Sequence, residues 1–227
     1  MESLLSSLKI NVSSCLFIKD PESSDLGQNI IVNSIDLIDD LGLEDFNFKK
    51  LGIAIQSNES SIYRYFENKY KLLQYLSALY WGILEYRLVI ETNAVENNSK
   101  KLLKAIKVLT VTPQNVSYYS NLDQIKLRNI VISEFTKSYH HKHVDSDNNE
   151  GIFKNYKRLI LRLVEMIQDA NPDYKFPKSL ATQIIEGGLQ QNFMQRHFTS
   201  LVDSTKDEQI CNFFEDITIN ALKLKQI

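Results

Sequence analysis

The chain has 227 residues, of which 43% are hydrophobic and 24% charged, and its formal net charge at pH 7 is −2. Such a chain can build a sizeable core, but its charge excludes a global electrostatic attraction to nucleic acid or to a membrane surface. Any contact with DNA must therefore come from a local patch. Only seven glycines and four prolines interrupt the long amphipathic runs, which predicts a mostly helical chain.

The cysteines and the first residues of the chain bear on its compartment. Cys15 and Cys211 lie near opposite ends without the spacing of metal ligands, which favours free or buried thiols in a reducing compartment. The start of the chain has no uninterrupted apolar block and is a poor secretory signal. No run approaches the roughly 18 apolar residues of a membrane span. We therefore expect a cytoplasmic protein without a membrane partner.

Residues 1–26 predict an irregular N-terminal extension. Apolar side chains at the even positions Ile10, Val12, Leu16 and Ile18 form a weakly strand-like alternation. We expect an extended arm that packs on the first helix or pairs with itself. Arms that enter the minor groove of DNA are rich in arginine or lysine, and this segment is not, so that role is not assigned to it.

Residues 27–73 predict a small domain of three helices. Apolar residues at helical spacing place these helices at about residues 26–41, 48–55 and 59–66. Gly42 is a natural stop for the first helix. Asn47 and Asn58 are good N-caps for the second and third helices, and the turn between those two lies at Gln56.

The remainder, residues 74–227, predicts a C-terminal helical domain entered through a long fourth helix at about residues 69–92. Further helices are expected at about residues 99–111, 122–141, 152–169, 177–198 and 205–225, with a polar loop at residues 143–151. The prediction is thus an all-α fold. An N-terminal three-helix bundle would be joined by the long helix to a larger helical body.

The short second and third helices have the layout of a helix-turn-helix, in which the second helix of the pair enters the major groove of DNA. Lys49 and Lys50 stand near the N-terminus of the first of them, where the helix dipole also favours a phosphate. The remaining candidate DNA contacts are Ser60, Ser61, Tyr63, Arg64, Tyr65 and Lys69. Hydroxyl groups can donate to phosphates, and an arginine can contact a phosphate or a guanine edge.

The stretch SSIYRYFENKYKLL resembles the signature of the TetR family of transcriptional regulators. The matching positions are Ile62, Tyr63, Phe66, Asn68, Lys69, Leu72 and Leu73, and the likeness covers about residues 30–73. The resemblance implies an all-α homodimer that binds double-stranded DNA. It also implies a cavity in the C-terminal domain for a small-molecule effector and a dimer interface built from the last two helices of each subunit.

Three features depart from the family pattern. Gln56 stands in the turn where the family usually has glycine, and it is costly if φ is positive there. Gly52 replaces a small alanine inside a helix, and Glu59 begins the recognition helix. Acidic residues also outnumber basic ones between residues 27 and 69, which predicts weak attraction to phosphates. These features keep open an alternative, namely a helical interaction or ligand-binding protein that has lost specific DNA binding.

Two further sets of residues are candidates for the effector cavity and the dimer interface. An aromatic cavity would be lined by Tyr80, Trp81, Leu84, Tyr118, Tyr119, Phe135 and Tyr139, with plain core packing as the alternative. The dimer interface would comprise Ile184, Gly187, Gly188, Gln191, Met194, Phe213, Phe214, Ile217 and Ala221. Two adjacent glycines inside a helix are costly unless another helix crosses closely there, either in the partner subunit or in the same chain.

No metal, cofactor or enzymatic activity is predicted. The densest group of possible metal ligands comprises His140, His141, His143, Asp145 and Asp147, but its spacing fits no strong template. The start of a calcium-loop pattern fails because Glu150 and Tyr156 stand where glycine and glutamate are required. A phosphate-binding glycine loop, a nucleophile elbow and a paired-cysteine site are also missing from the sequence. An enzyme built in a helical cavity therefore lacks a candidate acid–base pair.

Overall fold

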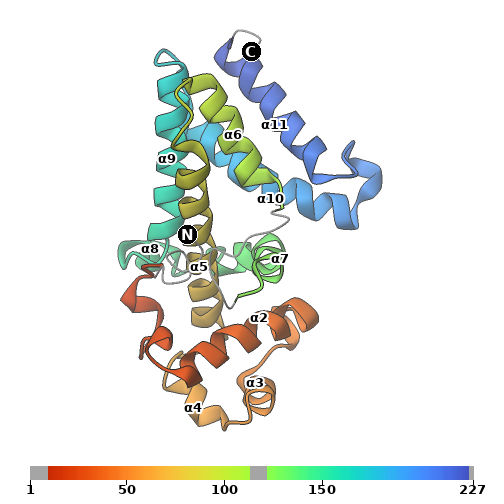
Figure 1. Ribbon diagram of the computed structural model, residues 1–227. Coiled ribbons are helices and arrows are strands. Elements are labelled where there is room, and N and C mark those ends of the chain that lie inside the picture. Colours follow the sequence, from red (N-terminus) through yellow and green to blue (C-terminus); the bar gives the residue numbers. More distant parts are fainter. Residues whose placement is uncertain (1–9, 113–121, 225–227) are drawn as a thin grey trace. The chain divides into compact units, whose positions relative to one another are not determined.

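The computed structural model describes residues 10–112 and 122–224, and every regular element in these ranges is a helix (Figure 1). The predicted all-α fold is therefore confirmed. The chain divides into two compact units. The first consists of Met1–Ile83 and Asn115–Asn155, and the second of Leu84–Gln114 and Tyr156–Ile227. Among the helices of the described ranges, none is both long and apolar enough to cross a membrane.

The first unit contains the predicted three-helix domain and more. Its elements are η1 (Ser14–Leu16), η2 (Pro21–Ser23), α2 (Asp25–Asp45), α3 (Phe48–Ala54), α4 (Glu59–Tyr63), the first part of α5 (Lys69–Thr92), α7 (Gln124–Glu134), η3 (Phe135–Ser138) and α8 (Val144–Asn149). Helix α2 packs along α7, a segment far away in the sequence (Figure 1). For this reason the unit extends beyond the expected boundary near residue 73.

The second unit is built from the end of α5 together with later helices. These are α6 (Asn98–Thr110), α9 (Lys154–Ala170, from Tyr156 onward), α10 (Pro177–His197), η4 (Thr199–Leu201) and α11 (Asp207–Leu222). Helices α6, α10 and α11 pack against one another. Pro177 begins α10 as expected, because its missing N–H group would have no partner in a first helical turn anyway.

The N-terminal arm is not a strand in its described part. Its backbone forms two short 3-10 turns, and Ile18 is 66% exposed, so the weak strand-like alternation does not correspond to a strand here. The turn η2 of the arm packs on α2, as expected, and other parts of the arm lie on α5 and on the residues before it. The Ile18 amide donates to the Tyr65 carbonyl oxygen at 2.8 Å, and the Ile10 side chain lies against Gly82, where any larger residue would clash.

Two predicted boundaries in the later chain were wrong. The helix expected to run to residue 141 ends at Glu134 and continues only as the 3-10 turn η3. The segment expected to be a polar loop contains the short helix α8, with Asp145 and Asp147 in its first turn. Carboxylates there are stabilised by the positive end of the helix dipole, which the loop prediction overlooked.

Candidate nucleic-acid interface

Helices α3 and α4 begin where the sequence predicts, and both starts are capped by asparagine. Asn47 Oδ1 accepts a hydrogen bond from the Lys50 amide at 2.9 Å, and Asn58 Oδ1 accepts one from the Ser61 amide at 2.8 Å. Each cap satisfies an amide that the helix itself leaves without a partner. The two helices contact each other, with Leu51 and Ile62 fully buried.

The geometry of the turn between the two helices bears on Gln56 and Gly52, the two positions there that depart from the family pattern. Gln56 has a φ of 52°, so its backbone adopts the left-handed conformation that glycine accepts more readily. A Cβ atom on Gly52 would lie 2.8 Å from the Ser57 carbonyl oxygen, which is too close for any side chain. Gly52 is thus required by the close approach of the turn, whereas Gln56 stores strain.

Most of the predicted DNA contacts are accessible on this part of the first unit. Lys49, Lys50, Ser60 and Arg64 are exposed. Ser61 is half-buried. Tyr63 is 47% exposed, and its ring packs edge-on against Phe48 with ring centroids 5.0 Å apart.

Some of these groups already have partners within the chain. Both Ser60 and Ser61 donate their hydroxyl hydrogens to Asn58 Oδ1 at 2.7 Å, so in this arrangement their oxygens are left as acceptors. The Lys50 ammonium donates to the Asp45 carbonyl oxygen at 2.7 Å. Among the described groups, this leaves Lys49 and Arg64 as the cations most available to a phosphate or a base edge.

The prediction that Tyr65 faces the groove was wrong. The side chain is only 1% exposed, and its hydroxyl lies 2.8 Å from Ser24 Oγ and accepts a hydrogen bond from the Lys19 ammonium at 3.2 Å. Helix α4 ends at Tyr63, so the chain turns inward before Tyr65 and buries it under the N-terminal arm. This arm lies outside the matched motif, and the motif alone gave no signal for the change.

The Lys69 ammonium is engaged inside the protein. It donates to the carbonyl oxygens of Leu43, Glu44 and Phe46 at 2.8, 3.1 and 3.4 Å. A lysine has three N–H donors, and all of them are used here. These carbonyls lie at the end of α2, beyond the break at Gly42, where φ is 75°. The geometry therefore gives Lys69 the role of a C-terminal cap rather than that of a phosphate ligand.

The acidic balance of the helix-turn-helix is partly compensated by lysines from α7 and η3. Asp36 pairs with Lys126 at 2.7 Å, and Glu44 pairs with Lys137 at 3.0 Å. The sequence count could not include these partners, which lie about 90 residues away in the chain. Glu59 remains exposed at the start of α4.

Two exposed side chains near this surface were not predicted as contacts. Ile53 at the end of α3 is 72% exposed, and Tyr70 in the first turn of α5 is 48% exposed. An exposed isoleucine can contact the methyl group of thymine, and an exposed tyrosine can donate to a phosphate. No functional role was predicted for Ile53 or for Tyr70.

The described members of the predicted aromatic cavity are mostly core residues. Trp81 is 1% exposed, and its ring packs edge-on against Phe135 and Tyr80 with centroids 5.1 and 4.9 Å apart. Phe135 in turn packs against Tyr139. Of the other residues in this set, Leu84 is buried and counted with the second unit, and Tyr118 and Tyr119 lie outside the described residues. The described rings therefore follow the core-packing alternative.

Packing within the chain explains Gly187 of α10, whereas a Cβ atom on Gly188 would make only an ordinary contact. A Cβ atom on Gly187 would lie 2.9 Å from the Phe214 ring of α11, and one on Gly188 would lie 3.4 Å from Thr110 of α6. Both glycines are buried, as are Ile184 and Phe214. Their assignment to an exposed dimer seam is therefore corrected.

The other predicted dimer residues keep accessible surface. They are Gln191, Met194, Phe213, Ile217 and Ala221, of which Phe213 is 49% exposed. Gln191 and Phe213 also border a hollow of about 330 Å³ between α10 and α11.

The chemistry of a metal centre is not visible in the part of the chain that the structure describes. Within residues 10–112 and 122–224, no group of three or more histidine, cysteine, aspartate or glutamate side chains is arranged to hold a metal ion. Of the two cysteines, Cys211 is buried, and its burial raises the pKa of its thiol to about 11.

Comparison with protein-family models and with curated proteins finds no match to this chain. Solved structures do match. AibR in complex with isovaleryl coenzyme A and operator DNA aligns with a TM-score of 0.58 at 17% identity, over 87% of this chain and 98% of that chain. The fatty acid degradation regulator FadR from Bacillus halodurans aligns with a TM-score of 0.62 at 15% identity, over 87% and 96%.

A regulatory protein of the tetR family from Rhodococcus RHA1 aligns with a TM-score of 0.61 at 12% identity, over 90% of this chain and all of that chain. The chain shares the fold of these regulators. At such low identity the likeness is one of fold alone. A function must therefore be inferred from the sequence motif at residues 60–73 and from the capped helices on either side of the turn.

Proposed function

We propose that this chain is a DNA-binding transcriptional regulator. The observation that carries the proposal is the pair of capped helices α3 and α4, joined by a turn at Gln56, with Lys49 and Arg64 exposed on it. A short helix followed directly by an arginine, in contact with a helix whose first turn carries a lysine, has what a major-groove reader needs. The arginine reads a base edge or a phosphate, and the lysine and the helix dipole hold a phosphate.

The regulator acts as a homodimer on a palindromic operator in this proposal. One reading unit with few free cations binds DNA weakly, because non-specific affinity grows with the number of phosphates neutralised. Two copies held together bind two half-sites about 34–36 Å apart, one helical turn of DNA. The dimer face would comprise the exposed residues of α10 and α11, with Phe213 as its apolar anchor.

Repression relieved by a small molecule is the proposed mode of regulation. AibR, which shares this fold, is described with isovaleryl coenzyme A and operator DNA. For this chain, a ligand that binds the DNA-free state better than the DNA-bound state would shift the population away from the operator. Helix α5 contributes residues to both units, so it is a physical route for that coupling.

Selection from a random pool of double-stranded oligonucleotides, followed by fluorescence anisotropy with the enriched sequence, tests DNA binding. Arg64→Ala should weaken binding roughly tenfold to a hundredfold, because a bidentate contact to guanine contributes about 1–3 kcal/mol. Lys104→Gln on α6, which removes an exposed positive charge outside the proposed interface, is the matched control and should bind like the wild type. Affinity should fall steeply between about 50 and 200 mM salt.

A helical interaction protein without DNA binding is the second candidate. Two residues favour this candidate. The exposed Glu59 at the start of α4 would repel phosphates, and Gln56 strains the turn that positions α4. A pool from which no sequence is enriched even at low salt would support this candidate over the regulator.

A further inference from the structure

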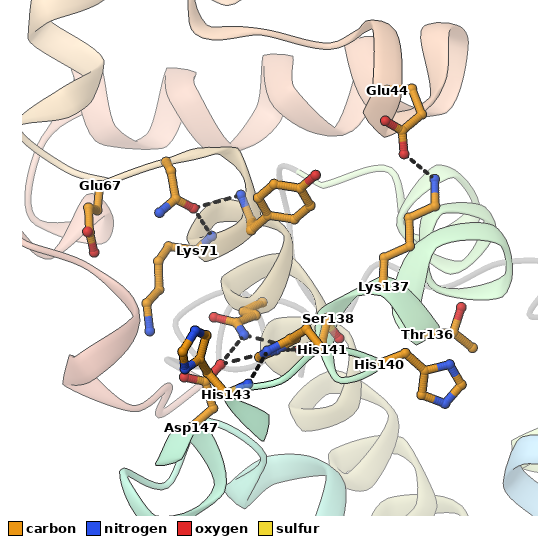
Figure 2. Close-up of a pocket in the computed structure, with 13 residues that line it drawn as sticks. Glu44, Glu67, Lys71, Thr136, Lys137, Ser138, His140, His141, His143 and Asp147 are labelled. Atoms are coloured by element: carbon orange, nitrogen blue, oxygen red, sulfur yellow. Dashed lines mark hydrogen bonds and ion pairs between the residues drawn. The ribbon is translucent and has the colours of Figure 1, made fainter. Parts of the chain in front are cut away.

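A polar cavity of about 780 Å³ lies in the first unit, beside the start of α5 (Figure 2). Its walls come from the end of α2, from the segment after α4, from the first turns of α5 and from the stretch that runs from η3 into α8. The size suits a metabolite, since ligand sites usually measure about 300–1,000 Å³. Of the aromatic residues proposed for the effector cavity that the structure describes, Tyr80, Trp81, Phe135 and Tyr139, none is among the side chains that line it.

Two of the three carboxylates in this cavity already have partners. Glu44 is paired with Lys137 at 3.0 Å. Asp147 Oδ2 accepts a hydrogen bond from Gln74 Nε2 at 2.7 Å and lies 3.5 Å from His141 Nε2. Glu67 is exposed at the rim. Glu44 is therefore neutralised by a lysine, and Asp147 is engaged by neighbouring side chains rather than open to a cationic ligand.

Two basic side chains that line the cavity, Lys71 and His143, are available to a ligand. Among the described residues, no hydrogen bond or ion pair holds the ammonium of Lys71 or a ring nitrogen of His143. In Figure 2 the Lys71 side chain extends from α5 on the side of the cavity where the rings of His141 and His143 lie. His141 is oriented by the Ser138 carbonyl oxygen at 3.1 Å and by the His143 amide at 3.2 Å.

We propose that this cavity binds a small organic anion, whose phosphate or carboxylate group is held by Lys71 and His143. An ammonium and an imidazole N–H both donate to oxyanions, and hydrogen bonds with ionised partners are roughly twice as strong as neutral ones. Gln74 donates a hydrogen bond to Asp147 and His141 lies beside the same oxygen, so this carboxylate is held by its neighbours when the anion enters.

The position of the cavity gives it a regulatory consequence, which rests on the proposed DNA-binding function. Glu67, Asn68 and Lys71 follow the recognition helix α4 within a few residues. Lys69, in the same turn of α5, holds the end of α2 through three hydrogen bonds. An anion on Lys71 therefore acts on the segment that orients α4 and changes the affinity for DNA.

The single tryptophan of the chain gives a direct assay on the full-length protein without DNA. Trp81 lies about two turns along α5 from Gln74, which lines the cavity, and it packs on Phe135, the first residue of η3, so its fluorescence reports changes in this unit. Pyrophosphate and citrate are the anionic probes, choline chloride is the cationic probe, and sodium chloride at matched ionic strength is the blank. Pyrophosphate or citrate should give a saturable change in fluorescence and raise the melting temperature.

The double variant Lys71→Gln/His143→Gln should lose roughly tenfold or more in anion affinity, because two donors to a charged ligand are removed. Lys104→Gln should bind the anions like the wild type. The proposal is overturned if neither anion saturates, if choline alone binds, or if the double variant, shown to be folded by circular dichroism, binds both anions as well as the wild type does.

DNA binding is measured separately, so that the two proposals fail independently. If the anions bind through Lys71 and His143 but no DNA sequence is enriched, the anion-binding proposal is supported and the DNA-binding proposal is refuted. If DNA binds, wild-type affinity for the enriched sequence should change when pyrophosphate or citrate is added, and the double variant should not respond. An unchanged affinity with the cavity saturated refutes the regulatory consequence.

Discussion

Gln56, in the turn between α3 and α4, has a strained backbone conformation. Its φ of 52° places a side-chain-bearing residue in the left-handed region, which costs roughly 1–2 kcal/mol relative to the right-handed helix. The turn is nonetheless well determined, because the Ser57 amide donates to the Gly52 carbonyl oxygen at 2.8 Å and the Gln56 amide donates to that of Ile53 at 3.2 Å. The surroundings therefore hold the conformation that the residue itself disfavours.

Gln56→Gly should stabilise the protein by about 0.5–1 kcal/mol, because glycine relieves the strain but gains freedom in the unfolded chain. The melting temperature should rise by a few degrees in a thermal scan. Gln56→Ala is the matched control, since it removes the same side chain and keeps the Cβ atom. Equal stabilisation by both variants would show that the side chain, and not the backbone conformation, is responsible.

At the scale of elements, the contact between α2 and α7 with η3 joins the helix-turn-helix to the later chain. Glu134, which is 7% exposed, accepts a hydrogen bond from the Leu43 amide at 3.4 Å, just after the break in α2, and pairs with Lys137 at 2.7 Å. Lys137 also pairs with Glu44. The hydrogen bond and the charge of Lys137 lower the pKa of the Glu44 carboxyl.

Lys137→Met should lower the melting temperature by a few degrees near pH 7, because it leaves the buried Glu134 carboxylate without its cation. Lys126→Met is the control and should cost less, since Lys126 and Asp36 are both partly exposed and surface pairs contribute little.

The pH dependence of the Lys137 pair has a definite sign. A carboxyl with a lowered pKa in the folded state contributes stability above its unfolded value, about 4.3 for glutamate, and loses it as the pH falls through the folded value. The difference in melting temperature between the wild type and Lys137→Met should therefore be present at pH 6–7 and shrink below about pH 4. A gap that stays constant across this range would contradict the role given to Glu44.

At the scale of the whole molecule, the proposed homodimer depends on α10 and α11. Both glycines of α10 are buried within the chain, so the face left for a partner is the accessible one that includes Phe213 and Ile217. Phe213 stands edge-on against the buried Phe214 with ring centroids 5.1 Å apart, which limits its freedom and suits it as an anchor.

Phe213→Asp should convert a dimer to a monomer in sedimentation velocity at micromolar concentration, because a carboxylate buried at an interface without a partner costs several kcal/mol. Phe176→Asp is the control. Phe176 is more exposed, at 63%, and lies outside the proposed face, so this variant should remain dimeric. A wild type that sediments as a monomer, or a Phe213→Asp variant that stays dimeric, would contradict the assignment of this face.

The starts of the helices could be predicted because their causes are local. Asn47, Asn58 and Pro177 mark helix starts through bonds to residues at most three positions away, or through a ring that fixes φ. The all-α class likewise follows from the apolar spacing and the scarcity of helix breakers. The site residues Lys49, Ser60 and Arg64 were expected to be accessible and are, since their exposure follows from the period of short capped helices.

Only the tertiary structure decided what the side chains of this region do. Tyr65 turns inward because the N-terminal arm covers it, and Lys69 turns toward the end of α2 because Gly42 breaks that helix and leaves carbonyls to be capped. The anion-binding cavity joins Lys71 to His143, which stand 72 positions apart. Periodicity and caps act over a few residues, whereas burial and ion pairing depend on which distant segments fold together, and a single sequence does not encode that in any local pattern.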